Sequence, residues 1–142
     1  MKIDSIQNGI VLDHIQAGRS MEIYQYLHLD QLDCSVAIMK NVRSRRLGKK
    51  DMIKIDTPME LDLDALAYID SSITVNLIQN GMVTEKKPLA LPDRLVNVIR
   101  CNNPRCITMA EPQLDAVFLL SSRRTHTYRC AYCDTPAGKL LG

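Results

Sequence analysis

The chain reads CNNPRC at residues 101–106 and CAYC at residues 130–133, and these two cysteine pairs decide the fold of its last third. Each pair can supply two thiolates from one turn, and the 23 residues between them allow the pairs to meet around one tetrahedral ion. Four thiolates close the coordination shell, so we expect a structural rather than a catalytic metal. The sequence therefore predicts one Zn²⁺ per chain, held by Cys101, Cys106, Cys130 and Cys133.

Two alternatives to zinc stay open at this point. Disulfides are disfavoured because the chain starts MKIDSIQNG, without an export signal, and the thiols of such proteins stay reduced. A rubredoxin-like iron site usually uses two CxxC turns, whereas four residues separate Cys101 from Cys106. Zinc is the better match to both observations.

The cysteine module is small, which makes a metal necessary for its folding. We place it at residues 93–142, a length at which apolar burial rarely outweighs chain entropy without a staple. A structural zinc contributes folding energy on the order of 10 kcal/mol. Residues 117–120 and 125–129 are predicted strands, and Phe118, Leu120 and Tyr128 are predicted core residues, so the module is expected to be a β-rich zinc domain.

Composition separates the two parts of the chain and limits its location. Hydrophobic residues make up 46% and charged residues 24% of the 142 residues, which is normal for a globular protein. Residues 1–93 carry 11 basic and 13 acidic side chains, whereas residues 94–142 carry 7 and 3. No apolar run approaches the ~20 residues needed to cross a bilayer, so we expect a cytoplasmic protein without a membrane partner.

Residues 1–92 show the alternation of a small α+β domain. The apolar, β-branched segment GIVLDHI (residues 9–15) predicts a buried strand, and Ser20 is the expected cap of the helix that follows. The predicted order is strand 9–15, helix 20–28, strand 34–42, basic loop 43–49, strand 50–56, a second helix and strand 73–78. This βαββαβ order is typical of the ferredoxin-like fold, an antiparallel sheet with two helices on one face.

The second helix has two candidate starts. Thr57-Pro58-Met59-Glu60 is a plausible capping box, and Asp62 is the alternative cap. After strand 73–78, Asn80-Gly81 predicts a tight turn into a short extra strand over residues 81–85. The prolines at residues 88 and 92 are expected to end this pattern, and residues 93–100 to form a connecting helix or turn.

Several charged residues are candidates for ligand binding. Strand side chains alternate, so Lys50 and Lys54 share one face of strand 50–56, opposite the apolar face that carries Ile53 and Ile55. These lysines could meet an anion or could form an ordinary solvated face. The basic cluster of residues 43–50 has the same two interpretations. Cys34 is expected to be a small buried residue rather than a reactive thiol.

The blocks GIVLDHI, GKKDMIKID, ITVNLIQN, LPDRLVNVIRC, CNNPRC, ITMAEP and YRCAYC together resemble the regulatory chain of aspartate carbamoyltransferase. They follow the family's order and extend over nearly the whole chain. The resemblance implies a non-catalytic subunit of pyrimidine biosynthesis, with an allosteric domain at residues 1–92 and a zinc domain at residues 93–142 that contacts the catalytic chain. It also implies a regulatory-chain homodimer that bridges catalytic trimers, with ATP as activator and CTP, with UTP, as inhibitors.

Carried over by position, the resemblance implies a nucleotide site in the first domain. Asp13 and His14 would lie at the ribose and phosphates, Lys54 at the ribose or base, and Lys86 at the triphosphate. The backbone near residues 6 and 81 would select the base. The complete implied set is Ile3, Asp4, Ile6, Val11, Asp13, His14, Lys50, Lys54, Asn76, Gly81, Val83 and Lys86.

Two other classes of function compete with this one. The basic balance of the last third supports a zinc-ribbon nucleic-acid-binding protein, but one Phe, five Tyr and no Trp offer few stacking platforms, so no nucleic-acid partner is expected. A ferredoxin-like enzyme is the third class. The sequence contains no local nucleophile, phosphate-loop or paired-carboxylate motif, which favours a binding role over catalysis.

Overall fold

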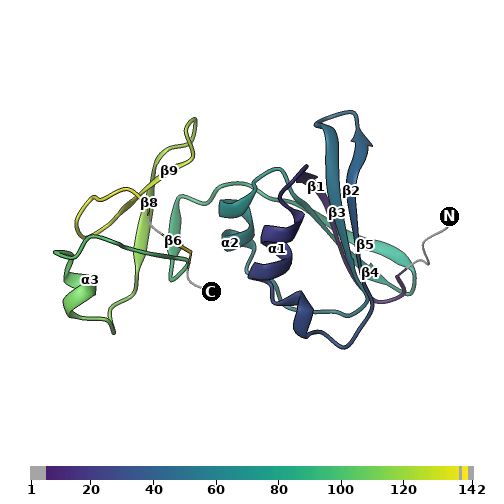
Figure 1. The fold of residues 1–142 in the computed structure, drawn as a ribbon, viewed down its shortest axis with the longest axis horizontal. Helices are drawn as coiled ribbons and strands as arrows, with labels where there is room; N and C mark the ends of the chain where they lie inside the picture. Colours follow the sequence, from purple (N-terminus) through teal and green to yellow (C-terminus); the bar gives the residue numbers. More distant parts are fainter. Residues whose placement is uncertain (1–5, 138, 141–142) are drawn as a thin grey trace. The chain divides into compact units, whose positions relative to one another are not determined.

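The computed structural model describes residues 6–137 and 139–140. The chain divides into two compact units, residues 1–90 and 91–142, which are called unit 1 and unit 2 (Figure 1). Among the described residues, no helix combines the length and the hydrophobicity needed to span a lipid bilayer.

Unit 1 is an antiparallel α+β structure. Its elements are β1 (Gly9–Gln16), α1 (Ser20–Tyr26), the short 3-10 helix η1 (Leu29–Gln31), β2 (Val36–Ser44), β3 (Gly48–Ile55), α2 (Leu63–Ile69), β4 (Thr74–Gln79) and β5 (Met82–Pro88). The sheet order is β2-β3-β1-β4-β5, so the first four strands have the ferredoxin-like arrangement and β5 adds an edge. The predicted fold class is confirmed.

The core of unit 1 lies between the sheet and its two helices, which cover the same face (Figure 1). Fully buried side chains from β1 and β3 form it, together with residues from both helices: Ile10, Leu12, Ile15, Ile53, Ile55, Ile23 and Leu66. Because strand side chains alternate, the residues between them point to the other side. This side, the open face, carries Val11, Asp13, Lys50, Lys54, Thr74, Asn76 and Lys86.

The N-cap residues of α1 and α2 both differ from the caps predicted first from the sequence. The cap of α2 is Asp62, whose carboxylate accepts a hydrogen bond from the amide of Ala65 at 3.1 Å, so the capping box at Thr57 is wrong. The cap of α1 is Arg19, and Ser20 lies buried inside the helix. Instead, the carboxylate of Asp51 on β3 accepts a hydrogen bond from the amide of Ser20. A distant strand therefore provides the hydrogen-bond acceptor that a local capping side chain was expected to provide.

The strands β2 and β3 are longer at their shared turn than predicted. Their pairing begins with Val36 opposite Ile55 and ends with Ser44 opposite Gly48. Most of the predicted loop 43–49 is therefore strand, and only residues 45–47 form the turn. Cys34 precedes β2 and is partly exposed, in contrast to the buried strand position expected for it. The pairing of the two strands also contains a register shift between Met39 and Val42.

The hairpin between β4 and β5 has the predicted turn. Asn80 and Gly81 both have positive φ, 52° and 77°, as a two-residue turn of this type requires. However, β5 continues to Pro88, beyond the predicted break, because it is an edge strand whose outer side needs no amide donors.

Unit 2 is small and rich in short strands. Its elements are β6 (Arg94–Val96), β7 (Ile99–Arg100), α3 (Ile107–Ala110), β8 (Val117–Ser122), β9 (Thr127–Cys130) and β10 (Lys139–Leu140). The strands β6, β8 and β9 form one sheet, and β7 pairs with β10. Phe118 and Tyr128 are fully buried as predicted, whereas Leu120 is partly exposed.

The connecting helix or turn predicted for residues 93–100 is wrong. Two short strands lie there, and Leu95 of β6 opposes Phe118 of β8 in the centre of the small core. Pairing with a strand more than 20 residues away overrides the weak local preference of a three-residue segment.

Candidate functional site

The four cysteines of unit 2 converge on one point. Their sulfur atoms all lie within 4.8 Å of one another, with 3.6 Å between Cys101 and Cys133 and 3.7 Å between Cys106 and Cys130. A tetrahedral ion with metal–sulfur bonds of ~2.3 Å holds its ligands about 3.8 Å apart. The distances and the all-sulfur donor set therefore fit a four-coordinate thiophilic metal.

Tight turns bring each pair of sulfurs together. In the first pair, the amide of Cys106 donates to the carbonyl of Asn103 at 3.0 Å, and the Asn103 side chain accepts from the amide of Arg105 at 3.0 Å. In the second pair, the amide of Asp134 returns to the carbonyl of Cys130 at 2.8 Å. Asp134 has a φ of 66°, which lets the chain fold back immediately after Cys133.

The protonation of these thiols shows why the cluster needs a cation. Burial raises the pKa of Cys101 to about 12, because a thiolate in an apolar environment is poorly solvated. The hydroxyl of Thr135, 3.1 Å from the sulfur of Cys133, lowers the pKa of Cys133 to about 6. Four thiolates cannot share so small a volume by themselves, so a metal cation must balance their charge.

The open face of unit 1 carries a continuous row of site candidates. In the strand register, Lys54 of β3 opposes Val11 of β1, Val11 opposes Asn76 of β4, and Asn76 opposes Lys86 of β5. Four residues that lie up to 75 positions apart in sequence thus form one line across the sheet. Among the described residues, neither lysine of the row has an ion-pair partner.

A bulge in β1 adds two more candidates beside this row. Leu12 opposes Ile53 and Ile15 opposes Asp51, so Asp13 and His14 together face a single residue of β3. His14 has a φ of 56°, and its Nδ1 lies 3.2 Å from the hydroxyl oxygen of Thr74. The bulge therefore keeps both polar side chains out of the core.

Lys50 is the third cation of the open face, and it is already paired. Its Nζ lies 2.9 Å from Oδ1 of Asp13. Burial acts to raise the pKa of Asp13, but the hydrogen bonds from Lys50 and from the amide of His14 outweigh it, and the pKa is lowered. Asp13 is thus a carboxylate at neutral pH and leaves Lys50 with little charge to offer.

Asn76 has an unsatisfied atom in the middle of the row. Its side chain is 7% exposed, and its Nδ2 donates a long hydrogen bond of 3.4 Å to the carbonyl of Val11. Its Oδ1 is buried and has no hydrogen-bond partner among the described residues. A buried acceptor without a partner is costly, which makes this position a candidate for contact with an external donor.

Comparison with known proteins identifies the chain's relatives. Residues 1–90 match the family described as "Aspartate carbamoyltransferase regulatory chain, allosteric domain", and residues 93–139 match the corresponding "metal binding domain". The chain belongs to the aspartate carbamoyltransferase regulatory chain family. Its relatives are named regulatory chains, so the prediction of a non-catalytic subunit is confirmed at the level of the family.

The regulatory chains most similar among those compared cover nearly the whole protein. The chain from Clostridium botulinum is 48% identical over 134 residues, which cover 94% of this chain and 92% of the relative. The chain from Bifidobacterium longum is 42% identical over 137 residues, 96% of this chain and 99% of the relative. The chain from Clostridium tetani is 44% identical over 135 residues, 94% of each.

Three further residues implied by the family resemblance, Ile6, Gly81 and Val83, lie at the end of the sheet near the β4–β5 turn. The amide of Gly81 donates to the carbonyl of Gln7 at 2.9 Å, so that group is occupied, and Val83 is 51% exposed on the edge strand. Ile6 packs its methyl group against Gly9. Ile3 and Asp4 lie outside the described residues.

The structure places two threonine hydroxyls at the cysteine cluster that were not predicted from the sequence. The hydroxyl of Thr108 lies 3.0 Å from the sulfur of Cys106. The hydroxyl of Thr135 likewise lies 3.1 Å from the sulfur of Cys133. In both cases the threonine follows the cysteine by two positions, a regularity that was available in the sequence. Hydroxyls that touch ligand sulfurs orient them and stabilise their charged form.

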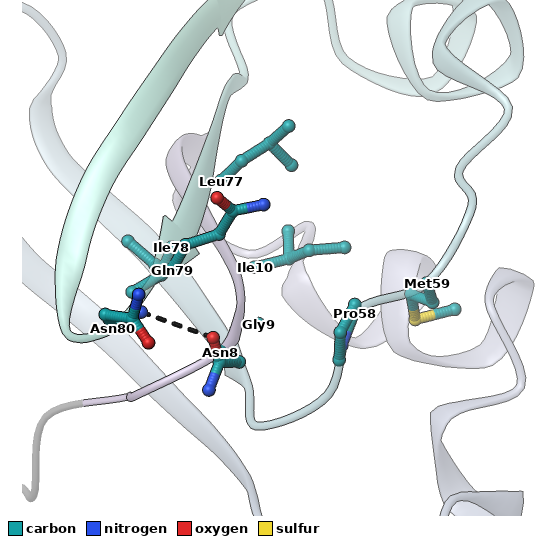
Figure 2. Close-up of a pocket in the computed structure, with 9 residues that line it drawn as sticks. All are labelled: Asn8, Gly9, Ile10, Pro58, Met59, Leu77, Ile78, Gln79 and Asn80. Atoms are coloured by element: carbon teal, nitrogen blue, oxygen red, sulfur yellow. Dashed lines mark hydrogen bonds between the residues drawn. The ribbon is translucent and has the colours of Figure 1, made fainter.

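One cavity of unit 1 is not part of the row. It measures about 320 Å³ and lies where β1 starts and β4 ends, near Pro58 and Met59 (Figure 2). Ile10 and Leu77 line it, and the only hydrogen bond drawn there joins the amide of Asn80 to Oδ1 of Asn8 at 3.2 Å. Since no charged side chain lines it, this cavity is poorly suited to a phosphorylated ligand.

Proposed function

We propose that this chain is a nucleotide-sensing regulatory subunit, which binds ATP, CTP and UTP on the open face of unit 1. Unit 2 holds one Zn²⁺ and contacts the catalytic chains of an aspartate carbamoyltransferase. A homodimer of regulatory chains links catalytic trimers and adjusts pyrimidine biosynthesis in the cytoplasm. The proposed domain division follows residues 1–92 and 93–142.

The observation that carries the nucleotide proposal is the row from Lys54 through Asn76 to Lys86. Counting only described residues as partners, it combines a buried oxygen that lacks a donor with two lysines that lack an anion. Ribose hydroxyls or a base amino group can donate to Asn76, and phosphate oxygens can accept from Lys86. One nucleotide laid along the row would satisfy both needs.

The distribution of charge sets the orientation of this nucleotide. A triphosphate carries about four negative charges, so it favours the part of the open face where several cations lie together. Lys86 acts electrostatically on His14 of the bulge, which favours the phosphates there, whereas the charge of Lys50 is already balanced by Asp13. Lys54 lies at the other side of the row, near the sugar or base.

The metal proposal rests on the donor set of unit 2. Cys101, Cys106, Cys130 and Cys133 supply four sulfurs at distances suited to tetrahedral coordination. Zinc in such a closed site supplies folding energy and performs no reaction. The surrounding loops carry the surface for a catalytic chain, so loss of zinc removes that surface.

The regulatory effect requires unequal affinity for two states. A chain without catalytic groups can change an enzyme's activity only by favouring one conformation of its partner. A nucleotide shifts this balance only if it binds the two conformations differently, and typical coupling between such sites is about 1–3 kcal/mol.

The binding test uses calorimetry on the zinc-loaded chain. Lys86→Ala should weaken ATP and CTP alike by about 1.5–3 kcal/mol, because both contain the triphosphate. The matched control is Lys87→Ala, since Lys87 is on the same strand, opposes Val75 and pairs with Glu85. Lys54→Ala should instead change discrimination between the two nucleotides.

Two outcomes would contradict the proposal. Affinities within about twofold of wild type after Lys86→Ala would remove that lysine from the site, and tighter binding of an oligonucleotide of equal charge would favour the nucleic-acid alternative. The regulatory part is tested by aspartate saturation of the complex reconstituted with catalytic trimers. Identical curves with and without saturating CTP or ATP would make this chain a structural bridge only.

A further inference from the structure

Arg46 lies in the turn between β2 and β3, within the densest cluster of basic residues in the sequence. Its Nη2 donates a hydrogen bond to the backbone carbonyl of Ser72, just before β4. The hydroxyl oxygen of Ser72 lies 2.8 Å from the carbonyl of His14 and 2.5 Å from Oδ1 of Asp70, so its single proton has two acceptors within reach. The turn is thus held beside the bulge that carries Asp13 and His14, although 26 residues separate Arg46 from Ser72.

The charge of Arg46 has no carboxylate partner among the described residues. Asp70 contacts Ser72 as well, but it is buried and already accepts hydrogen bonds from the amides of Gln16 at 2.7 Å and Ser72 at 3.0 Å. The ion pairs described in unit 1 are Lys50 with Asp13 and Lys87 with Glu85. Within the described part of the chain, the guanidinium therefore bonds only to a neutral carbonyl.

The environment of His14 shows which cations lie near Arg46. Burial is the main cause that lowers the pKa of His14, and Asp13 opposes it. The positive charges of Arg46, Lys50 and Lys86 lower it further. Three cations from β3, β5 and the β2–β3 turn thus act electrostatically on one imidazole, and among the described residues only Lys50 of the three has an anionic partner.

We propose that Arg46 is a further ligand of the phosphate chain and exchanges the Ser72 carbonyl for phosphate oxygens when a nucleoside triphosphate binds. This inference rests on the nucleotide site proposed above. The exchange is favourable because a hydrogen bond between two charged groups is roughly twice as strong as one to a neutral carbonyl. The planar guanidinium can also bind two phosphate oxygens at once, which an ammonium group cannot do with the same geometry.

The position of Arg46 makes its contribution depend on the number of phosphates. It reaches the bulge from the side of Ser72, at the end of β4 away from the β4–β5 turn. A group there contacts the distal phosphates and not the base. Arg46 should therefore favour triphosphates over monophosphates and should be indifferent to the choice between adenine and cytosine.

The test compares ATP, ADP and AMP by calorimetry on the zinc-loaded full chain. Arg46→Ala should weaken ATP at least about tenfold and AMP less than twofold, as expected for one lost charge-assisted hydrogen bond to a distal phosphate. Arg46→Gln keeps a neutral donor for Ser72 and should lose the same ATP affinity without loosening the turn. Arg45→Ala is the matched control, since the Arg45 side chain is exposed and makes no described hydrogen bond or ion pair.

Two results would overturn the role of Arg46. ATP affinity within twofold of wild type in both Arg46 variants would show that the residue only fastens the turn. Equal losses for ATP and AMP would show that it acts through the fold. Failure of the proposed function looks different, because wild-type chain would then bind none of the three nucleotides.

Discussion

Asn76 offers a perturbation whose effects on stability and on binding have opposite signs. Replacing it by leucine removes the buried Oδ1, which has no hydrogen-bond partner in the described part of the chain. Leucine has a similar size, so the substitution leaves little empty space at this 7% exposed position. The variant should be more stable than wild type without nucleotide and should bind nucleotides less tightly.

The magnitude follows from the contacts of the side chain. A buried acceptor without a partner costs about 1–3 kcal/mol, and its removal recovers that amount. The hydrogen bond from Nδ2 to the carbonyl of Val11 is also lost, but its length of 3.4 Å places it at the weak end, near ~0.5 kcal/mol. The net gain should be about 1–2 kcal/mol, or an increase in Tm of roughly 5–10 °C for a unit of this size.

The assay is hydrogen exchange of β4 in the zinc-loaded full chain, because the protection of residues 74–79 reports on unit 1 alone. Nucleotide affinity is measured in parallel and should fall about tenfold, the loss expected for one hydrogen bond. Asn8→Leu is the control, since Oδ1 of Asn8 accepts from the amide of Asn80, and this variant should gain no stability. A loss of more than about 1 kcal/mol in the Asn76 variant would refute the reasoning, because Oδ1 would then have a partner in solution.

Two further predictions concern the metal centre and a buried carboxylate. Cys130→Ser should release the metal and unfold unit 2 while leaving the affinity of unit 1 for ATP unchanged; retained folding of unit 2 after metal analysis shows zinc to be absent would contradict it. Burial acts to raise the pKa of Asp51, but hydrogen bonds from the amides of Asn41, Gly18 and Ser20 outweigh it and lower the pKa below 3.8. The stabilisation by this carboxylate is therefore complete above its ordinary pKa and is lost as the pH falls through the lowered value. Asp51→Asn should cost about 2 kcal/mol or more at pH 7 and much less near pH 3, measured by hydrogen exchange of α1; an equal cost at both pH values would contradict this.

The lysines of the open face show what strand alternation in the sequence can predict and what it cannot. Alternation in the sequence placed Lys50 and Lys54 opposite Ile53 and Ile55, and the structure confirms it, because strand geometry fixes the side of every second residue. The same pattern could not show that Lys50 is paired with Asp13 while Lys54 is not. That difference depends on the bulge in β1, which is set by the register between two strands.

Helix starts and short strands show the opposite case. Thr57 and Asp62 both satisfied the local rules for a cap, and only the packing of α2 on the sheet selected Asp62. The segment 94–96 is too short to show the alternation of a strand, so β6 could be recognised only from its pairing with β8. Local propensities of a few tenths of a kcal/mol decide little when a tertiary contact is available.

The sequence by itself determined the order of the elements of unit 1, the two faces of β3 and the four cysteines of the cluster. These properties follow from periods of two and 3.6 residues and from the spacing of cysteines, all of which are local. The tertiary structure decided that Asn76 is buried without a partner, that Arg46 reaches Ser72 and that Asp51 binds the start of α1. Each of these contacts joins residues far apart in the chain, so it depends on strand register and packing, which no single segment encodes.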